Sequence, residues 1–334
     1  MFIELSFRTS IKRIISLIIF TVGAFAVISA TTYGWRFWRR ASGSIREDKD
    51  IMLAGRLEKH VYKLSHEIGD RSVFEYHNLQ KAAEYIAGQL SSFGYSVRFQ
   101  SYDVLNKKVG NIIAEKKGSQ KPCEVIIVGA HYDTCFNPGA DDNASGVAGV
   151  IELAREFSKR DTKHTIRFVA FVNEEPPFLK TGDMGSVVYA KELKKKGDVI
   201  KGAVILEMIG YYTEKTFSQR YPPLLGAVYP NKGNFICLAG NFPSRKLLNK
   251  VVSGFRKGTS FPVESITLGF APGADLSDHW SFWEEKYPAV MFTDTAFFRY
   301  PHYHKDSDIW EKLDYEKMSY VVKGVASALR ELAE

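Results

Sequence analysis

The chain has 334 residues, of which 45% are hydrophobic and 25% charged, a composition typical of a globular protein. Its net charge of +7 is uneven, because residues 1–50 hold eight Lys and Arg against four Asp and Glu. A basic excess at one end indicates a membrane flank and argues against a nucleic-acid surface. Three cysteines do not make a disulfide framework, which excludes a disulfide-stapled scaffold.

The first predicted element is a membrane-spanning helix. The stretch from Ile14 to Tyr33 carries no charge and is long enough to cross a bilayer. Three basic residues precede it and three arginines follow within a few positions, as is typical of a membrane anchor. We therefore expect a short basic tail over residues 1–13, a transmembrane helix over residues 14–35 and a linker over residues 36–50.

A cleaved signal peptide is the alternative for this segment, since Ala24-Phe25-Ala26 offers an A-x-A cleavage pattern. The apolar run continues past these residues, and the arginines behind it resemble a stop-transfer flank, so a retained single-pass anchor is favoured. Three Lys and Arg precede the span and five follow it through Lys49. Taken literally, the positive-inside rule would place the rest of the chain in the cytoplasm.

One domain is expected over residues 51–334. Apolar residues at helical spacing alternate with short apolar runs, and this βαβ rhythm predicts an α/β fold with a mostly parallel mixed sheet flanked by helices. Residues 212–270 are less regular and are assigned to the same domain. The main predicted elements are helices over residues 57–69, 79–93, 145–157, 184–195 and 315–332 and strands over residues 95–104, 110–115, 124–128, 165–172 and 199–206.

Potential metal ligands follow the ends of the predicted strands. His131, in GAHYDT, comes directly after one strand, and the acidic segment PGADDNASG follows shortly behind it. Glu174 and Glu175 end FVAFVNEE, and Glu207 ends the next strand. His304 lies in PHYHKDSD, which follows the strand-like PAVMFTDT. Imidazole and carboxylate are the ligands of hydrolytic zinc sites, and sites in open α/β sheets lie beyond the strand ends.

These segments together resemble the di-zinc aminopeptidases of the bacterial leucyl aminopeptidase type, a family that also includes aminopeptidase Y and the glutaminyl cyclases. The resemblance runs from about Leu57 to Leu332 and rests on GAHYDT, PGADDNASG, NEE, LEMIGYY, LSDHWSFW and PHYHKDSD. It implies a zinc-exopeptidase-like fold. It also implies an extracytoplasmic catalytic domain, which is the location we expect although the charge count points the other way.

The resemblance implies two zinc ions per chain and a role for each ligand. In this interpretation one zinc lies between His131 and Glu207, the other lies between Glu175 and His304, and Asp141 bridges both. The family also implies a cis peptide after the bridging residue, here Asp141–Asp142. Glu207 stands where the family usually has Asp; glutamate is one methylene longer and still binds zinc.

Further roles follow from position beside these ligands. Glu174 adjoins a ligand and is the expected general base. Asp133 lies two residues after His131 and is expected either to accept its second imidazole N–H or to act only as a turn residue. Asp278 and His279 match a family segment that lines the substrate site, with a packing role as the alternative.

Several nearby residues are interpreted as structural. His302 and Asp308 are expected to support the loop, not to bind metal, and nothing indicates that Cys135 is a nucleophile. Cys123 and Cys135 flank an extended strand, so their Cα atoms are too far apart to bridge. The aromatic residues near the C-terminal motifs either form an apolar side-chain pocket or belong to the core; they are Trp280, Trp283, Phe297, Phe298 and Tyr300.

The predicted function is a membrane-anchored zinc aminopeptidase that removes a large apolar first residue from peptides with a free N-terminus. Its expected cofactor is Zn²⁺, and its expected partners are peptides and a membrane, without nucleic acid. A glutaminyl-peptide cyclotransferase on the same scaffold is the first alternative. A non-catalytic, receptor-like domain is the second, although the apparently full ligand set argues against it.

Overall fold

The computed structural model describes residues 49–222, 225–227, 229–267 and 273–334. One compact unit, residues 46–222 and 230–334, holds the whole sheet; residues 1–45 and 223–229 form another, described only around the 3₁₀ turn Leu225–Ala227. The predicted transmembrane helix and most of the predicted linker lie outside the described residues. Among those described, no helix combines the length and apolar character needed to cross a bilayer.

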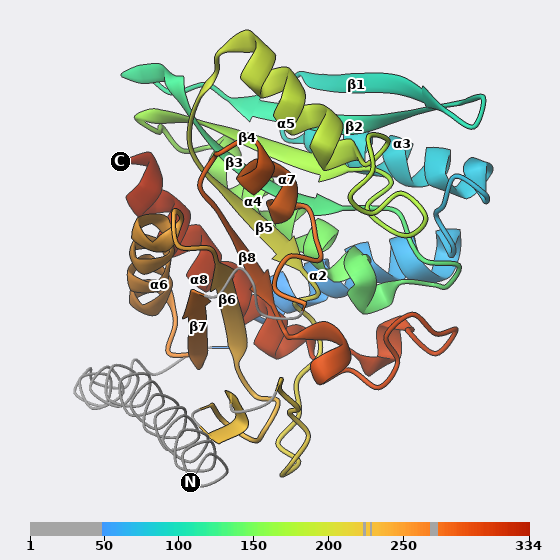
Figure 1. Ribbon diagram of the computed structural model, residues 1–334, viewed down its shortest axis with the longest axis vertical. Helices are drawn as coiled ribbons and strands as arrows, with labels where there is room; N and C mark the ends of the chain where they lie inside the picture. The colour runs from blue at the N-terminus through green and yellow to red at the C-terminus, as the bar shows by residue number, and fades with distance from the viewer. Residues whose placement is uncertain (1–48, 223–224, 228, 268–272) are drawn as a thin grey trace, which may run out of the picture. The chain divides into compact units, whose positions relative to one another are not determined.

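The larger unit is built on an eight-stranded mixed sheet (Figure 1). Its strand order is β1-β2-β4-β3-β5-β8-β6-β7. The pairs β3–β4, β3–β5, β5–β8 and β6–β7 are parallel, whereas β1–β2, β2–β4 and β6–β8 are antiparallel. The strands are β1 Val97–Val104, β2 Lys107–Lys116, β3 Lys121–His131, β4 His164–Phe171, β5 Val199–Glu207, β6 Ile236–Gly240, β7 Val263–Thr267 and β8 Ala289–Thr293.

Helices cover both faces of the sheet. Helices α2, α3, α4, α6 and α8 belong to the larger hydrophobic core on one face, and α5 and α7 to a smaller core on the other, in front of the sheet in Figure 1. The helices are α2 Ile51–Tyr62, α3 Tyr76–Ser92, α4 Gly146–Ser158, α5 Gly185–Lys196, α6 Arg245–Gly258, α7 His279–Glu284 and α8 Tyr315–Ala333. Short helical turns lie at Lys63–Ile68, Ala140–Ser145, Ala296–Phe298 and Trp310–Lys312.

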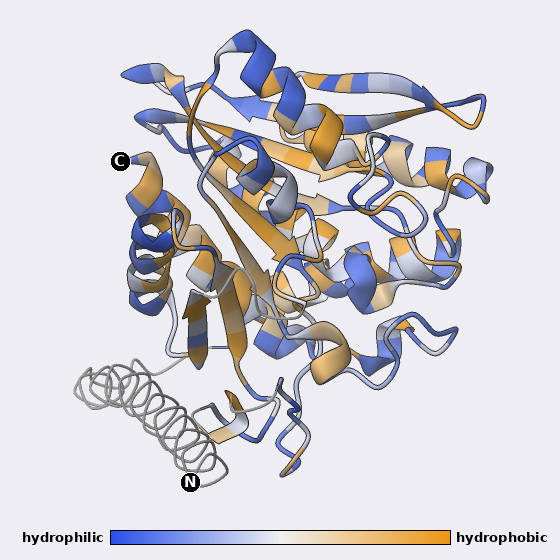
Figure 2. Ribbon diagram, viewed as in Figure 1, coloured by the Kyte–Doolittle hydropathy of each residue, from blue (hydrophilic) through white to orange (hydrophobic). Residues whose placement is uncertain are grey.

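The central strands are apolar on both faces because both faces are covered. In β3, Val125 and Ile127 point into the smaller core, whereas Ile126 and Val128 point into the larger one. This alternation is the two-residue period of a strand applied to a continuous apolar run. In Figure 2 the central strands are coloured mainly as hydrophobic, whereas the flanking helices carry both hydrophobic and hydrophilic residues.

The predicted α/β class, with a mixed sheet flanked by helices, is confirmed. The first helix begins at Ile51, earlier than predicted, because Asp50 accepts a hydrogen bond from the N–H of Leu53 at 2.9 Å and caps it. Strand β3 is longer than predicted and carries His131 as its last residue. The short elements β7 and α7 were not predicted.

Candidate metal centre

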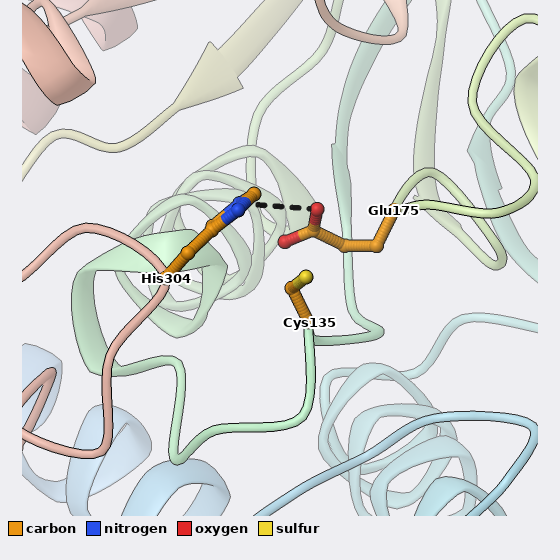
Figure 3. Close-up of side chains that lie close together, drawn as sticks. All are labelled: Cys135, Glu175 and His304. Carbon is orange, nitrogen blue, oxygen red and sulfur yellow. Dashed lines mark ion pairs between the residues drawn. The ribbon is translucent and has the colours of Figure 1, made fainter.

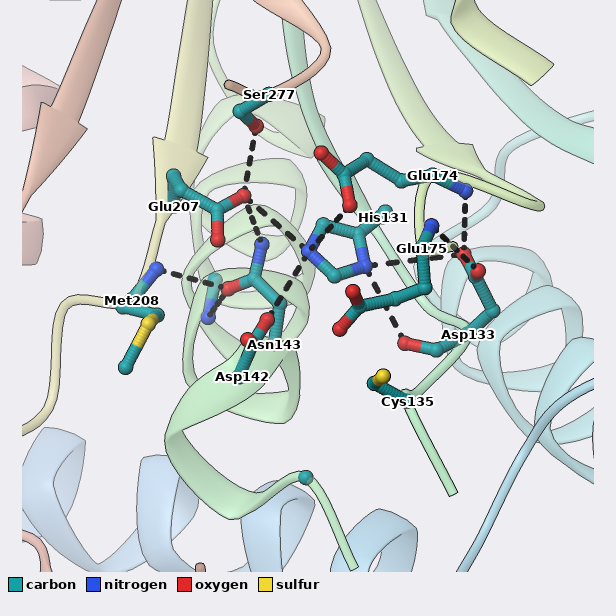
Figure 4. A network of polar contacts seen from close by, with 12 residues as sticks. His131, Asp133, Cys135, Asp142, Asn143, Glu174, Glu175, Glu207, Met208 and Ser277 are labelled. Atoms are coloured by element: carbon teal, nitrogen blue, oxygen red, sulfur yellow. Dashed lines mark hydrogen bonds and ion pairs between the residues drawn. The ribbon is translucent and has the colours of Figure 1, made fainter. Parts of the chain in front are cut away.

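The predicted ligands meet at one edge of the sheet. His131 ends β3 and Glu207 ends β5, while Glu174 and Glu175 lie in the turn after β4. His304 comes from the loop after β8. Strands β4, β3, β5 and β8 are parallel neighbours, so their carboxyl ends share an edge and bring these side chains together. Figure 4 shows His131, Glu174, Glu175 and Glu207 side by side.

The carboxylate of Asp142 lies between the two histidines. His131 Nε2 is 3.3 Å from Asp142 Oδ1 and 3.2 Å from Glu207 Oε2. On the other side, His304 Nε2 is 3.2 Å from Asp142 Oδ2 and 3.2 Å from Glu175 Oε2. Each histidine thus shares one oxygen of Asp142 and has a glutamate of its own.

This arrangement corrects the expectation for Asp141. Its Oδ1 accepts a hydrogen bond from the N–H of Gly210 at 2.9 Å, away from both histidines. Burial, with Asp294 as an acidic neighbour, raises the pKa of Asp141 well above its ordinary value. The residue between the two histidines is the second of the two aspartates. The cis peptide, likewise, joins Asp142 to Asn143, one residue later than expected.

The donor set fits divalent cations. His131 Nε2, His304 Nε2 and Glu175 Oε1 are buried atoms without a hydrogen-bond partner among the described residues. The N···O separations of 3.2–3.3 Å match the edge of a tetrahedron, about 3.3 Å, drawn around zinc with bonds of about 2.0–2.1 Å. Ligand atoms of His131, Asp142 and Glu207 lie within 4.8 Å of one another, as cation binding requires.

Electrostatics point to the same conclusion. Burial and the nearby Asp142 raise the pKa of Glu175 to about 8. Burial alone would lower the pKa of His304, but its contacts with Asp142 and Glu175 raise it to about 10. Buried carboxylates that outnumber their cationic partners retain protons unless a cation neutralises them. The centre therefore favours bound metal over free carboxylates.

Glu174 lies beside this centre but farther from the imidazole than the other carboxylates. Its Oε2 is 3.9 Å from His131 Nε2, against 3.2 Å for Glu207. Burial raises its pKa well above the ordinary value, an effect that His131 opposes and Glu175 strengthens. A carboxyl group with raised pKa next to, but outside, the closest ligand contacts is suited to moving protons.

Asp133 positions the neighbouring ligands. Its two side-chain oxygens accept hydrogen bonds from the backbone N–H groups of Glu174 and Glu175, at 3.0 and 3.1 Å. His131 Nδ1 is 3.2 Å from the backbone oxygen of Asp133 but 3.7 Å from its carboxylate. The second imidazole nitrogen is thus oriented by the backbone of Asp133, while its side chain holds the paired glutamates.

Asp308 holds the segment that carries Asp142. Its side chain accepts the backbone N–H groups of Asp141 and Asp142 at 2.9 and 3.1 Å and the hydroxyl of Tyr300 at 2.8 Å. Burial raises its pKa to about 6. The expectation of a supporting role for Asp308 agrees with these contacts.

Glu207 is fixed by two polar side chains. Ser277 Oγ donates to Glu207 Oε2 at 2.7 Å, and Asn143 Nδ2 donates to the same oxygen at 3.2 Å (Figure 4). Asn143 also accepts the N–H groups of Gly146 and Met208, which ties helix α4 to the end of β5. Sequence reasoning did not identify Ser277 or Asn143 as supports of Glu207, because Glu207 lies more than sixty positions away from each.

Arg71 is a buried support that sequence reasoning also missed. It is fully buried, and burial lowers its pKa to about 10. Among the described residues its guanidinium donates to backbone oxygens alone, including those of Tyr132, Pro138 and Gly139 at 2.7–3.0 Å. Arg71 therefore stabilises the loop between His131 and Asp142.

Asp278 and His279 differ in their relation to the centre. Asp278 is buried, and burial raises its pKa to about 7. The nearby charge of His131 opposes this rise, and that of Glu207 adds to it. It therefore faces the same charges as the ligands. His279 packs edge-on against Trp283 and its Nε2 lies 2.7 Å from the Ala274 oxygen; burial lowers its pKa to about 4. Its contacts are those of a packing residue.

The aromatic residues also divide between core and site. Trp283 and Tyr300 are buried in the core. Phe297 and Phe298 are half-buried, and Phe297 packs on Tyr303, which in turn stacks on the His304 ring at 3.8 Å. His302 Nδ1 lies 2.8 Å from Ser307 Oγ, a contact within its own loop.

Comparisons with known proteins identify the family. The model of Peptidase family M28 matches residues 111–329. The Escherichia coli (strain K12) protein YfbL is 39% identical over 284 residues, which cover 82% of this chain and 86% of that protein. Leucine aminopeptidase 1 of Trichophyton equinum is 29% identical over 63% of this chain, which spans about half, 55%, of that relative.

Solved structures share the fold at low identity. The zinc aminopeptidase BSAP of Bacillus subtilis has a TM-score of 0.68 at 18% identity, covering 83% of this chain and 94% of that one. A glutaminyl cyclase of Bacteroides thetaiotaomicron has a TM-score of 0.63 at 18% identity, covering 83% and 97%. Because the family model matches more than half of the chain, the chain belongs to peptidase family M28, and the expected zinc metallopeptidase is confirmed.

Proposed function

We propose that this protein is a two-metal aminopeptidase that removes the first residue of peptides with a free N-terminus. The observation that carries the proposal is the placement of Asp142, which offers one oxygen to each histidine, 3.3 Å from His131 and 3.2 Å from His304. His131 with Glu207 would hold one zinc ion, and His304 with Glu175 the other, Asp142 contributing to both. Zinc bound there would supply an acidified water and a Lewis acid for the scissile carbonyl.

The side chains of the protein supply the proton movements. Glu174 lies beside the ligands without being the closest of them, so it is placed to take a proton from the attacking water and return it to the leaving amine. Asp133 keeps Glu174 and Glu175 in this orientation through their backbone N–H groups. Asp278 adds a further buried carboxyl group, which makes the surroundings anionic and suits a substrate ammonium group.

The names of two relatives support peptide substrates, since one is called probable leucine aminopeptidase 1 and the other probable zinc metalloprotease. The half-buried Phe297 and Phe298, together with Tyr303 against His304, offer an apolar surface for a large first side chain. The buried Trp283 and Tyr300 are unavailable for this purpose. A large apolar residue is therefore the proposed preference at the substrate's N-terminus.

The deciding experiment compares three substrates on the purified protein, with zinc per chain measured in parallel. Leucyl- and phenylalanyl-anilides should be hydrolysed, their N-acetylated forms should not, and chelation should abolish the activity. Conversion of N-terminal glutaminyl peptides to pyroglutamyl peptides, with one zinc and no anilide hydrolysis, would assign the cyclotransferase instead. Removal of C-terminal residues from N-blocked peptides would contradict the aminopeptidase assignment.

We also propose that residues 14–35 anchor the protein in a membrane with the catalytic domain outside the cytoplasm. The uncharged apolar stretch and its flanking arginines, in a segment outside the described residues, support the anchor. The location outside the cytoplasm rests on the family resemblance alone, because the count of Lys and Arg around the stretch points the other way. The full chain should stay with membranes after alkaline carbonate washing, and added protease should cleave it in spheroplasts. A shorter soluble form that begins after Ala26 or Ala30 would show a cleaved signal instead.

A further inference from the structure

We propose that the thiol of Cys135 is an additional metal ligand on the His304–Glu175 side of the centre, an inference that rests on the proposed function. The side chains of Cys135, Glu175 and His304 face one another (Figure 3), and their Sγ, carboxylate oxygen and imidazole nitrogen lie within 4.8 Å of one another. Thiolate, imidazole and carboxylate are a favourable ligand set for zinc, with a Zn–S bond of about 2.3 Å.

An unpaired oxygen of Glu175 points independently to a cation at this place. Glu175 is only 4% exposed, and its Oε2 lies 3.2 Å from His304 Nε2. Its other oxygen, Oε1, has no hydrogen-bond partner among the described residues. A buried carboxylate oxygen left unpaired beside a thiol and an imidazole is satisfied by a metal ion that all three contact.

The loop around Cys135 is held in place. Asn137 Nδ2 donates to the backbone oxygen of Cys135 at 2.8 Å, and Asn137 Oδ1 accepts the N–H of Gly139 at 2.7 Å. Arg71 donates to the backbone oxygens of Tyr132 and Pro138 on either side of Cys135. The thiol is therefore presented from a fixed backbone, as a metal ligand requires.

The surroundings of Cys135 suit a ligand better than a nucleophile. The strongest charges acting on it belong to the carboxylates of Glu175, Asp142 and Asp133. Reactive cysteines lie in electropositive surroundings, so these acidic neighbours argue against nucleophilic chemistry. A bound cation reverses the local charge, and coordination replaces the S–H bond by an S–metal bond while the proton passes to solvent.

A fourth protein ligand would make the two metal positions unequal. His304, Glu175, Asp142 and Cys135 would close a tetrahedral shell, as in structural zinc sites, whereas His131, Glu207 and Asp142 leave a position open for water, as in catalytic sites. Two zinc affinities should result, the tighter one belonging to the Cys135 side. Because Cys135→Ser removes the thiolate from this set, it should weaken the binding of one zinc ion by about 100-fold, which is about 2.8 kcal/mol.

Cobalt substitution tests the sulfur–metal bond directly. The Co²⁺-loaded protein should show an intense near-ultraviolet band from sulfur-to-cobalt charge transfer, which Cys135→Ser removes. Cys123→Ser, at an exposed position away from the centre, should retain both the band and the basal activity. A wild-type protein that binds two cobalt ions without this band, or a band that persists in Cys135→Ser, would overturn the assignment.

Alkylation gives a second readout that does not depend on activity. Bound zinc should protect Cys135 during prolonged iodoacetamide treatment, and removal of the zinc should raise the rate at which Cys135 reacts, although its acidic neighbours keep that rate below the rate of Cys123, the internal reference in both states. A measurable reaction of Cys135 that is equally fast with and without zinc would contradict ligation. Failure of the wild type to bind cobalt would overturn the proposed two-metal function itself, whereas two bound ions with chelator-sensitive hydrolysis but no band would overturn only the role of Cys135.

Discussion

Replacing each of the two adjacent aspartates by asparagine separates their roles. Asp142→Asn removes the carboxylate that lies 3.3 Å from His131 and 3.2 Å from His304. Asp141→Asn is the matched control, since it makes the same isosteric change one residue earlier. An asparagine at this position retains the side-chain oxygen that accepts the N–H of Gly210.

The structure sets the size of the expected difference. A zinc site of four ligands is worth roughly 10–16 kcal/mol, or about 3 kcal/mol per ligand, which is a factor of about 100 in affinity. Because each oxygen of Asp142 belongs to a different histidine, Asp142→Asn should weaken both zinc ions by about that factor. Asp141→Asn touches neither histidine and should change either affinity by at most about 10-fold.

Zinc affinity is measured by competition with a chromophoric chelator, and metal per chain by atomic emission after dialysis. Circular dichroism of both variants checks that the chain remains folded. Asp142→Asn is expected to lose most of both ions under conditions where Asp141→Asn and the wild type keep them. The reverse result, two ions lost from Asp141→Asn and kept by Asp142→Asn, would restore the assignment made from the sequence and refute the one made from the structure.

Three further results are expected. Glu174→Gln should lower kcat by roughly 10²–10⁴ with normal zinc content, because a general base contributes about that factor; loss of zinc would instead make Glu174 a ligand. Glu207→Asp should keep both ions, whereas Glu207→Ala should weaken only the His131 side, and unchanged zinc binding in the alanine variant would remove Glu207 from the centre. Burial raises the pKa of Glu175 to about 8. Burial would lower the pKa of His304, but its contacts with Asp142 and Glu175 raise it to about 10. The folded chain therefore holds these two protons more tightly than the unfolded chain does. The melting temperature of the metal-free, chelated protein should therefore fall as the pH rises from about 7 to about 9. Saturating zinc should abolish this decline. A melting temperature of the chelated protein that rises with pH would contradict the direction of these pKa shifts.

The parts of the fold that the sequence predicted are those with strong local signals. The apolar runs of β3, β4 and β5 are buried on both faces, so their period and length were readable without the structure. Their parallel alignment placed His131, Glu175 and Glu207 at one edge, because each lies at or just after the end of its strand. Strand β8 is only five residues long but wholly buried and apolar, whereas β7, of the same length, is half-buried and mixes polar with apolar residues. Helix α7 has six residues, too few for a helical period to show.

The supporting residues of the centre could not be predicted, because their roles come from distant contacts. Asp308 accepts the N–H of Asp141 from 167 positions away, and Ser277 reaches Glu207 across 70 positions. Arg71 precedes the loop it stabilises by more than sixty positions and resembles any other arginine in the sequence. Each of these three residues lies in a loop, and the complete fold brings it to its partner.

The sequence alone could not decide between Asp141 and Asp142 as the residue between the two histidines. Both are buried, adjacent and chemically identical, so composition and spacing give them equal standing. The difference arises from two backbone conformations. Gly139 is left-handed, with φ 57° and ψ 52°, and Asp142 is not helical, with φ −105° and ψ 88°. Asp308 binds both N–H groups and fixes this geometry, sending the first carboxyl group toward Gly210 and the second between the histidines. Two chemically identical residues thus take different roles because Asp308, more than 160 positions later in the chain, fixes the backbone that carries them.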